Sequence, residues 1–218
     1  MTTKPKRTIA DRLAAARLAI EGALADPEVL AELSVFGYEQ TRIEEGLALY
    51  QETRSLNEAQ MAKYGDQYDA TANVNSAWEI ADSEFAVSRR IARIAMKDNL
   101  KALGSLRLNE SRKKRFAKWT VQAEAFYNNL LAEPALITQM GRFGYDQARL
   151  EAEAAQVRSV IDADVVQEGA KGQAQEGTLM RDEKLDALDE WMSDFKAVAR
   201  IALTDNPQRL EKLGFGAV

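Results

Sequence analysis

Phe36-Gly-Tyr-Glu-Gln-Thr-Arg-Ile-Glu44 is the stretch that decides the fold, because it returns 107 positions later as Phe143-Gly-Tyr-Asp-Gln-Ala-Arg-Leu-Glu151. Other pairs at this offset of 107 are Pro27 with Pro134, Gly65 with Gly172, Asp98-Asn99 with Asp205-Asn206, and Leu106 with Leu213. Self-similarity at a fixed period is the signature of a repeated structural unit. The sequence therefore predicts an internal duplication, with one copy in residues 1–108 and the second in residues 109–218.

Each copy has the pattern of a helical bundle. Ile9, Leu13, Ala16, Ile20 and Leu24 recur every three or four positions, as on one face of an amphipathic helix. Asp26-Pro27 is typical of a helix start, with an aspartate cap and a proline in the first turn, and Gly37 is suited to a helix end.

A long helix is expected to follow from Glu39, and another to run from about Trp78 to Asp98-Asn99, which would cap a last short helix. We expect a turn between these two helices within Gly65–Asn75, and its counterpart within Gly172–Asp182. Turn-forming residues are sparse there, so a nearly continuous helix is the alternative. The predicted fold class is all-α, with two tandem bundles of three long and two short helices each.

Composition excludes several kinds of chemistry. The chain of 218 residues has no cysteine and no histidine, which excludes disulfides, thiolate or imidazole metal sites, and catalytic triads that need these residues. Neither a phosphate-binding glycine loop nor a calcium-loop pattern occurs. We therefore expect no cofactor, no metal site and no enzymatic activity.

Charge and hydropathy bear on partners and location. The formal net charge is −5 and neither half is basic overall, so we do not expect nucleic acid as a partner. The basic N-terminal residues are not followed by an uncharged apolar stretch, and no window approaches a membrane-spanning length. A cytoplasmic protein without a transmembrane segment is expected.

The repeated Phe-Gly-Tyr segment is the first candidate site. Its polar side chains could form a pocket that is used twice, consisting of Tyr38, Gln40, Arg42 and Glu44, and of Tyr145, Gln147, Arg149 and Glu151. The alternative is a device that starts a helix, in which glycine permits the bend, the aromatic residues wedge into the core and the arginine pairs across one turn. The helix-start interpretation is preferred, since preservation of the segment in both copies argues for a folding requirement that the copies share.

Basic residues form the second candidate. One stripe consists of Arg89, Arg90, Arg93 and Lys97, and a cluster near the second copy consists of Lys113, Lys114, Arg115 and Lys118. Such groups can bind the phosphates of nucleic acid or of an anionic membrane. Because the chain is acidic overall, a solvated face or an interface is the preferred interpretation.

Three functions follow in order of preference. The first is a structural or interaction protein that assembles with itself as a homo-oligomer or filament, or that scaffolds a protein partner. Its apolar end, Leu213–Val218, would then pack against a neighbouring subunit. The second is a module with a groove for an apolar ligand, a lipid or an amphipathic helix. The third is a binder of anionic surfaces or nucleic acid through the Arg89–Lys118 region.

Overall fold

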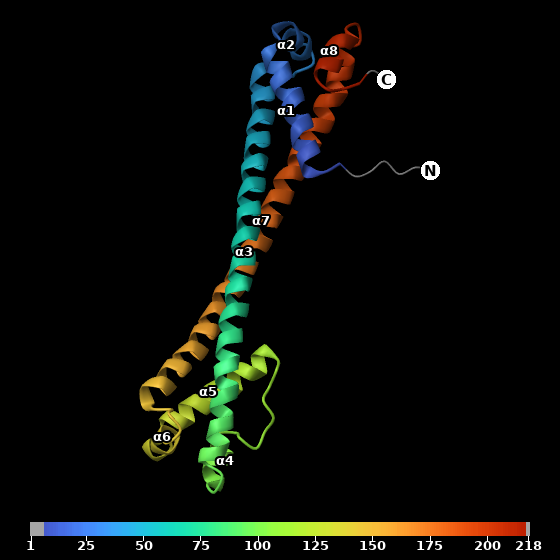
Figure 1. Cartoon of the computed structure of the whole chain (residues 1–218). Coiled ribbons are helices and arrows are strands. Elements are labelled where there is room, and N and C mark those ends of the chain that lie inside the picture. Colours follow the sequence, from blue (N-terminus) through green and yellow to red (C-terminus); the bar gives the residue numbers. More distant parts are fainter. Residues whose placement is uncertain (1–6, 217–218) are drawn as a thin grey trace, which may run out of the picture. The chain divides into compact units, whose positions relative to one another are not determined.

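The computed structural model describes residues 7–216, and within them the chain is all-helical, with no strand. In chain order the helices are α1 (Ile9–Ala25), α2 (Pro27–Ser34), α3 (Gln40–Ala95), α4 (Leu100–Ser105), α5 (Phe116–Leu131), α6 (Pro134–Gly141), α7 (Gln147–Ala202) and α8 (Pro207–Lys212) (Figure 1). The predicted fold class, all-α, is confirmed.

The helix starts use the residues that the sequence pattern indicated. Asp26 caps α2 by accepting hydrogen bonds from the backbone N–H groups of Glu28 and Val29 at 3.1 and 3.3 Å, and Pro27 occupies the first turn. Asn99 caps α4 through a bond of 3.0 Å from the N–H of Ala102. These polar caps satisfy N–H groups that have no partner within the helix.

The expected turns at Gly65–Asn75 and Gly172–Asp182 do not occur. Instead α3 and α7 each run through these segments as one helix of 56 residues. The four prolines of the chain all lie outside these two helices, at positions 5, 27, 134 and 207. Glycine alone destabilises a helix interior by only about 1 kcal/mol, which its neighbours can offset. The predicted count of three long and two short helices per copy is thus wrong, because each copy has one very long helix.

Contacts divide the chain into two compact units that differ from the two sequence copies. Unit 1 consists of Met1–Tyr64 with Gln173–Val218, and unit 2 consists of Gly65–Gly172. A unit therefore takes one part of α3 and one part of α7. Each packed unit thus combines residues from both sides of the predicted division at residues 108 and 109.

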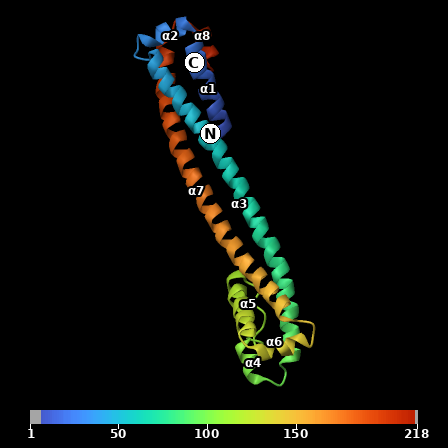
Figure 2. The same cartoon turned by 90° about the vertical axis from the view of Figure 1, so that its left-hand side faces the viewer.

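Unit 1 is closed by helices from both ends of the chain. In Figures 1 and 2, α1 lies beside the first part of α3 and the last part of α7. Its core contains Ile20, Tyr38 and Phe195, with ring centroids of Tyr38 and Phe195 5.4 Å apart. Leu213 and Phe215 are also buried in this core, so these two residues of the C-terminal segment pack within their own chain. Residues 217–218, the end of the segment expected to pack against a neighbouring subunit, and residues 1–6 lie outside the described residues.

Unit 2 has the more aromatic core. Phe85 of α3 makes edge contacts with Trp119 and Phe126 of α5, at centroid distances of 6.2 and 5.5 Å. All three side chains are fully buried, and such pairs stabilise a core beyond the area they bury. The aromatic cluster fixes α5 against the second part of α3.

Candidate functional site

The two copies of the Phe-Gly-Tyr segment have the same local geometry. Gly37 and Gly144 have φ of 78° and 80°, the left-handed region that suits glycine after a helix. Tyr38 and Tyr145 are buried, with the guanidinium carbons of Arg42 and Arg149 at 4.2 and 3.8 Å from the ring centroids. The glutamines, Gln40 and Gln147, each donate to the glutamate one turn on, Glu44 or Glu151, at 2.8 Å. Most of these contacts are local to the segment, as expected of a device that starts a helix; the exceptions are the Tyr38 hydroxyl, which is buried without a hydrogen-bond partner, and Arg149, which also donates to Glu153.

The phenylalanines of the segment do not wedge into the core. Phe36 is 47% exposed and Phe143 is 44% exposed, whereas the neighbouring tyrosines are buried. The chain reverses direction at the glycine, which turns the tyrosine inward and leaves the phenylalanine at the surface. The expectation that both aromatic residues pack inside is therefore wrong for the phenylalanines.

Val35 and Phe36 are exposed at the end of α2, and we group them with two exposed residues at the end of α7 under the name unit 1 end patch. Ile201 and Asp205, at the end of α7, are exposed as well. The amide of Asn206 donates to Glu32 of α2 at 3.0 Å, which ties the turn after α7 to α2. The unit 1 end patch is thus defined as Val35, Phe36, Ile201 and Asp205.

Unit 2 has a related surface, which we call the unit 2 end patch. Ile94, Lys97, Arg142 and Phe143 line one surface cavity of about 410 Å³ together with Asp98. Ile94 is 56% exposed, and the side chains of Lys97 and Asp98 are 74% and 89% exposed. This patch combines two apolar side chains with an excess of positive charge.

A buried polar cluster in unit 2 was not identified by the sequence pattern. Glu153 of α7 is 5% exposed and accepts hydrogen bonds from the hydroxyls of Ser88 and Tyr127, the latter at 3.0 Å, and from Nε of Arg149 at 3.1 Å. Burial and the charge of Glu153 raise the pKa of Glu84, one of whose carboxylate oxygens is buried without a partner. Burial raises the pKa of Tyr127 as well. Because three side chains already donate to Glu153, this carboxylate holds α3, α5 and α7 together.

Unit 1 has apolar residues where unit 2 has this cluster. At 107 positions from Glu153, Glu84, Ser88 and Tyr127 stand Gly46, Trp191, Phe195 and Ile20. The indole ring of Trp191 lies over Gly46, in space that a Cβ would occupy, and stacks on Phe195 at 5.0 Å. The signal for the polar cluster was thus present in the sequence, as four polar residues where the other copy is apolar or glycine.

The eight basic candidate residues are not brought together as one surface. Arg89 is buried, and its Nη2 donates to the backbone carbonyls of Arg107 and Glu110 at 2.8 and 2.9 Å. Arg93 donates to the carbonyls of Leu108 and Glu110 at 2.9 and 3.0 Å. Two members of the stripe therefore hold the loop between α4 and α5.

The remaining basic residues are placed differently. Lys113 pairs with Glu110 at 3.1 Å, and Lys97 lies in the unit 2 end patch. Arg90, Lys114, Arg115 and Lys118 are exposed. Arg90 lines a small surface cavity of about 230 Å³ with Arg89, Arg93 and Arg112. Arg112 was not among the candidates from the sequence, because it reaches the other three arginines only when its loop folds back on α3.

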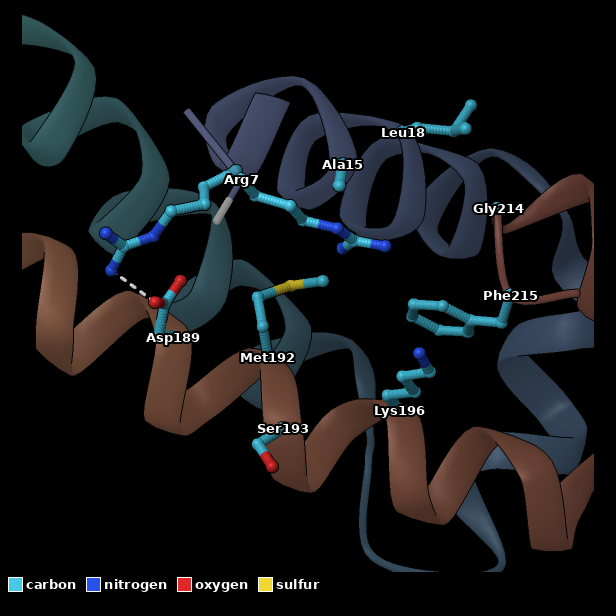
Figure 3. Close-up of a pocket in the computed structure, with 10 residues that line it drawn as sticks. Arg7, Ala15, Leu18, Asp189, Met192, Ser193, Lys196, Gly214 and Phe215 are labelled. Carbon is cyan, nitrogen blue, oxygen red and sulfur yellow. Dashed lines mark hydrogen bonds and ion pairs between the residues drawn. The ribbon is translucent and has the colours of Figure 1, made fainter. Parts of the chain in front are cut away.

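One charged cavity of unit 1 lies between α1, α7 and the segment around Phe215 (Figure 3). It has a volume of about 590 Å³, and Met192, Lys196 and Arg7 line it with Phe215. Within it Asp189 forms the ion pair that a dashed line marks in Figure 3, and its partner is Arg12, which the figure does not label. Lys196 has its Nζ 5.6 Å from the centroid of the Phe215 ring. Some of the charged groups that line this cavity thus have their interaction partners inside unit 1.

Two kinds of feature are absent from residues 7–216, namely a carboxylate cluster for a metal ion and a membrane-spanning helix. Residues 7–216 contain no group of three or more carboxylates placed to hold a metal ion. Nor does any helix in this range combine the length and the apolar character of a membrane-spanning segment. Comparison of the chain with family models, curated proteins and solved structures finds no match.

Proposed function

We propose that this protein is a non-enzymatic structural protein that assembles with itself, head to tail, through the two end patches. In this proposal the unit 1 end patch of one chain docks on the unit 2 end patch of the next. The observation that carries the proposal is the half-exposed phenylalanine that each copy of the repeated segment presents, Phe36 in unit 1 and Phe143 in unit 2. Exposed aromatic side chains in an apolar setting are typical anchors of protein interfaces.

The proposal includes an internal duplication of one helical unit. In support, α1, α2, α3 and α4 begin at residues 9, 27, 40 and 100, and α5, α6, α7 and α8 begin at 116, 134, 147 and 207. Each pair of starts differs by the offset of 107 that the sequence comparison gave. The left-handed glycines before α3 and α7 differ by the same number. A duplicated unit would give each chain two related patches, and thus two possible contacts with other chains.

Charge favours contact between unlike patches. Asp205 is the charged member of the unit 1 end patch, whereas Lys97 and Arg142 outweigh Asp98 in the unit 2 end patch. Two unit 2 patches would bring like charges together, which disfavours that pairing. Contact between unlike patches is heterologous, so it extends into an open filament or closes into a ring.

Single substitutions test the proposal, with oligomeric state measured by light scattering and sedimentation velocity. We expect mass to increase with concentration in the unchanged chain. The Phe36→Asp chain alone and the Phe143→Asp chain alone should each remain monomeric over the same range of protein concentration. Either change places a carboxylate in the contact between a unit 1 end patch and a unit 2 end patch, and the proposal has no other kind of contact. Loss of an interface anchor of this kind weakens association by about 30-fold or more.

Mixing the two variants distinguishes unlike from like contacts. The Phe36→Asp chain keeps an intact unit 2 patch, and the Phe143→Asp chain keeps an intact unit 1 patch. Their mixture should therefore form a dimer and stop there. If either variant alone still dimerises, contact is between like patches and the head-to-tail arrangement is wrong.

Matched controls carry the same change outside the patches. Val121 on α5 and Leu179 on α7 are 54% and 71% exposed. Val121→Asp and Leu179→Asp should leave the concentration dependence of mass unchanged. A monodisperse monomer of the unchanged chain at high concentration would reject self-assembly altogether.

A further inference from the structure

The cavity of about 230 Å³ in unit 2 is walled by four arginines. Arg89, Arg90 and Arg93 come from consecutive turns of α3, and Arg112 comes from the loop between α4 and α5. Four guanidinium groups around one small space repel one another, so this arrangement needs negative charge to balance it.

Arg89 lines the cavity and is only 3% exposed. Its two hydrogen bonds both come from Nη2 and go to neutral backbone carbonyls. Its Nε and Nη1 are buried without a partner. Burial and the charge of Arg93 lower the pKa of Arg89, as expected for a cation held away from water beside another cation. A buried charge is normally paired, and Arg89 lacks such a pair.

Carboxylates near the cavity do not supply the missing charge. Asp82 is paired with Arg112, and Glu110 is paired with Lys113. Among the ion pairs of residues 7–216, none involves Arg89, Arg90 or Arg93. Arg89, Arg90 and Arg93 thus form no ion pair in the described residues, although the charge of Glu110 favours the protonated form of Arg89.

We propose that this cavity binds one small oxyanion of the phosphate or sulfate class, held by Arg89, Arg90, Arg93 and Arg112. Guanidinium groups present planar pairs of donors that match the oxygens of such an anion. Arg90 is the exposed member, and its own hydrogen bond is a long one of 3.3 Å to the carbonyl of Ala86 in the same helix. It is therefore free to turn toward an anion.

The size and the surroundings of the cavity favour a single anion over a polymer. The basic residues outside the cavity are dispersed, and the chain carries a net charge of −5, which repels an extended polyanion. In unit 1, the positions 107 residues after Arg89, Arg90 and Arg93 hold Lys196, Ala197 and Arg200. The loss of one of the three cationic groups there leads us to expect one anion per chain.

Calorimetric titration tests the proposal with inorganic phosphate and with sulfate, in sodium chloride at constant ionic strength. We expect one site per chain, for which chloride competes only weakly. Arg90→Gln should weaken binding by about tenfold or more, as expected for removal of a hydrogen bond to a charged group. Arg115→Gln removes the same charge from an exposed position outside the cavity, and should change the affinity by less than about twofold.

A second variant and two further probes complete the test. Arg89→Met should abolish binding, and circular dichroism shows whether the variant keeps its helix content. Equal heats for phosphate, sulfate and added chloride, or equal weakening by Arg90→Gln and Arg115→Gln, would overturn the proposal. Tighter binding of single-stranded DNA or of vesicles with anionic lipid than of phosphate, lost equally in both variants, would instead indicate a dispersed basic surface. The Phe36→Asp chain should bind phosphate as the unchanged chain does, so the result is separate from that on assembly.

Discussion

Gly46 shows at the scale of one residue how the interiors of the two units differ. A Cβ at this position would overlap the ring of Trp191, whereas a Cβ at Gly65 in the same helix would meet nothing within 4 Å. We expect Gly46→Ala to lower the free energy of unfolding by about 2 kcal/mol, since overpacking a core costs about 1–3 kcal/mol. Urea denaturation followed by circular dichroism measures the change.

The control for this prediction is Gly65→Ala, which should raise stability by about 0.5–1 kcal/mol, because alanine replaces glycine inside a helix without a clash. Gly46→Ala combined with Trp191→Leu should cost less than the sum of the two single changes. Additive costs would contradict the contact, and a loss of stability in Gly65→Ala would contradict a continuous α3.

Glu84 is a residue of unit 2 whose negative charge is disfavoured by folding. Its pKa is raised in the folded chain by burial and by the charge of Glu153, so the folded state binds its proton more tightly than the unfolded state does. The stability contributed by this protonated group is therefore present at low pH and is lost as pH rises through the raised pKa. We expect Glu84→Gln to stabilise the protein at pH 7, and this gain to disappear at about pH 4, near the ordinary value for glutamate.

Urea denaturation of both chains at several pH values tests this expectation. Glu79→Gln removes a charge from an exposed position on the same helix, and should show no comparable dependence on pH. An equal gain from Glu84→Gln at pH 4 and pH 7 would show that ionisation of Glu84 does not oppose folding.

At the scale of elements, the sequence predicts what short-range chemistry determines. The caps Asp26 and Asn99 and the bend at Gly37 were identified because each acts within a few residues of itself. The same reasoning fails at Gly65, where the choice between a turn and a continuous helix depends on packing along α3 and α7. Local pattern alone could not settle that choice.

The candidate sites divide in the same way. The helix-start arrangement around Tyr38 and Tyr145 is local, and each could be interpreted from one segment. The cavity of Arg89 brings the loop after α4 to α3, and the buried Glu153 of α7 bonds to Tyr127 of α5, so each site joins segments that are far apart in the chain. Their partners depend on tertiary contacts, which the spacing of residues in a single sequence does not give.

At the scale of the whole molecule, the packed units and the sequence copies make different predictions about fragments. Residues 65–172 form one continuous segment that contains all of unit 2, including its aromatic core of Phe85, Trp119 and Phe126. We expect this fragment to fold on its own and to unfold cooperatively in urea. Residues 1–108 contain α1 to α4 but complete neither unit, because unit 1 also needs residues 173–218 and unit 2 needs α5.

A monomeric 1–108 fragment should therefore unfold over a broad range of urea concentration, with less helix than the same residues have in the full chain. Its apolar positions on α1 and α3 would lack their α7 partners, Leu188 and Phe195, which are buried in the core of unit 1. A helix that cannot bury its apolar face is marginal in water. Circular dichroism and sedimentation of the two fragments distinguish folding by packed unit from folding by predicted sequence copy. If the 1–108 fragment is a monomer that unfolds cooperatively while the 65–172 fragment is disordered, the sequence copies, and not the packed units, are the folding units of this protein.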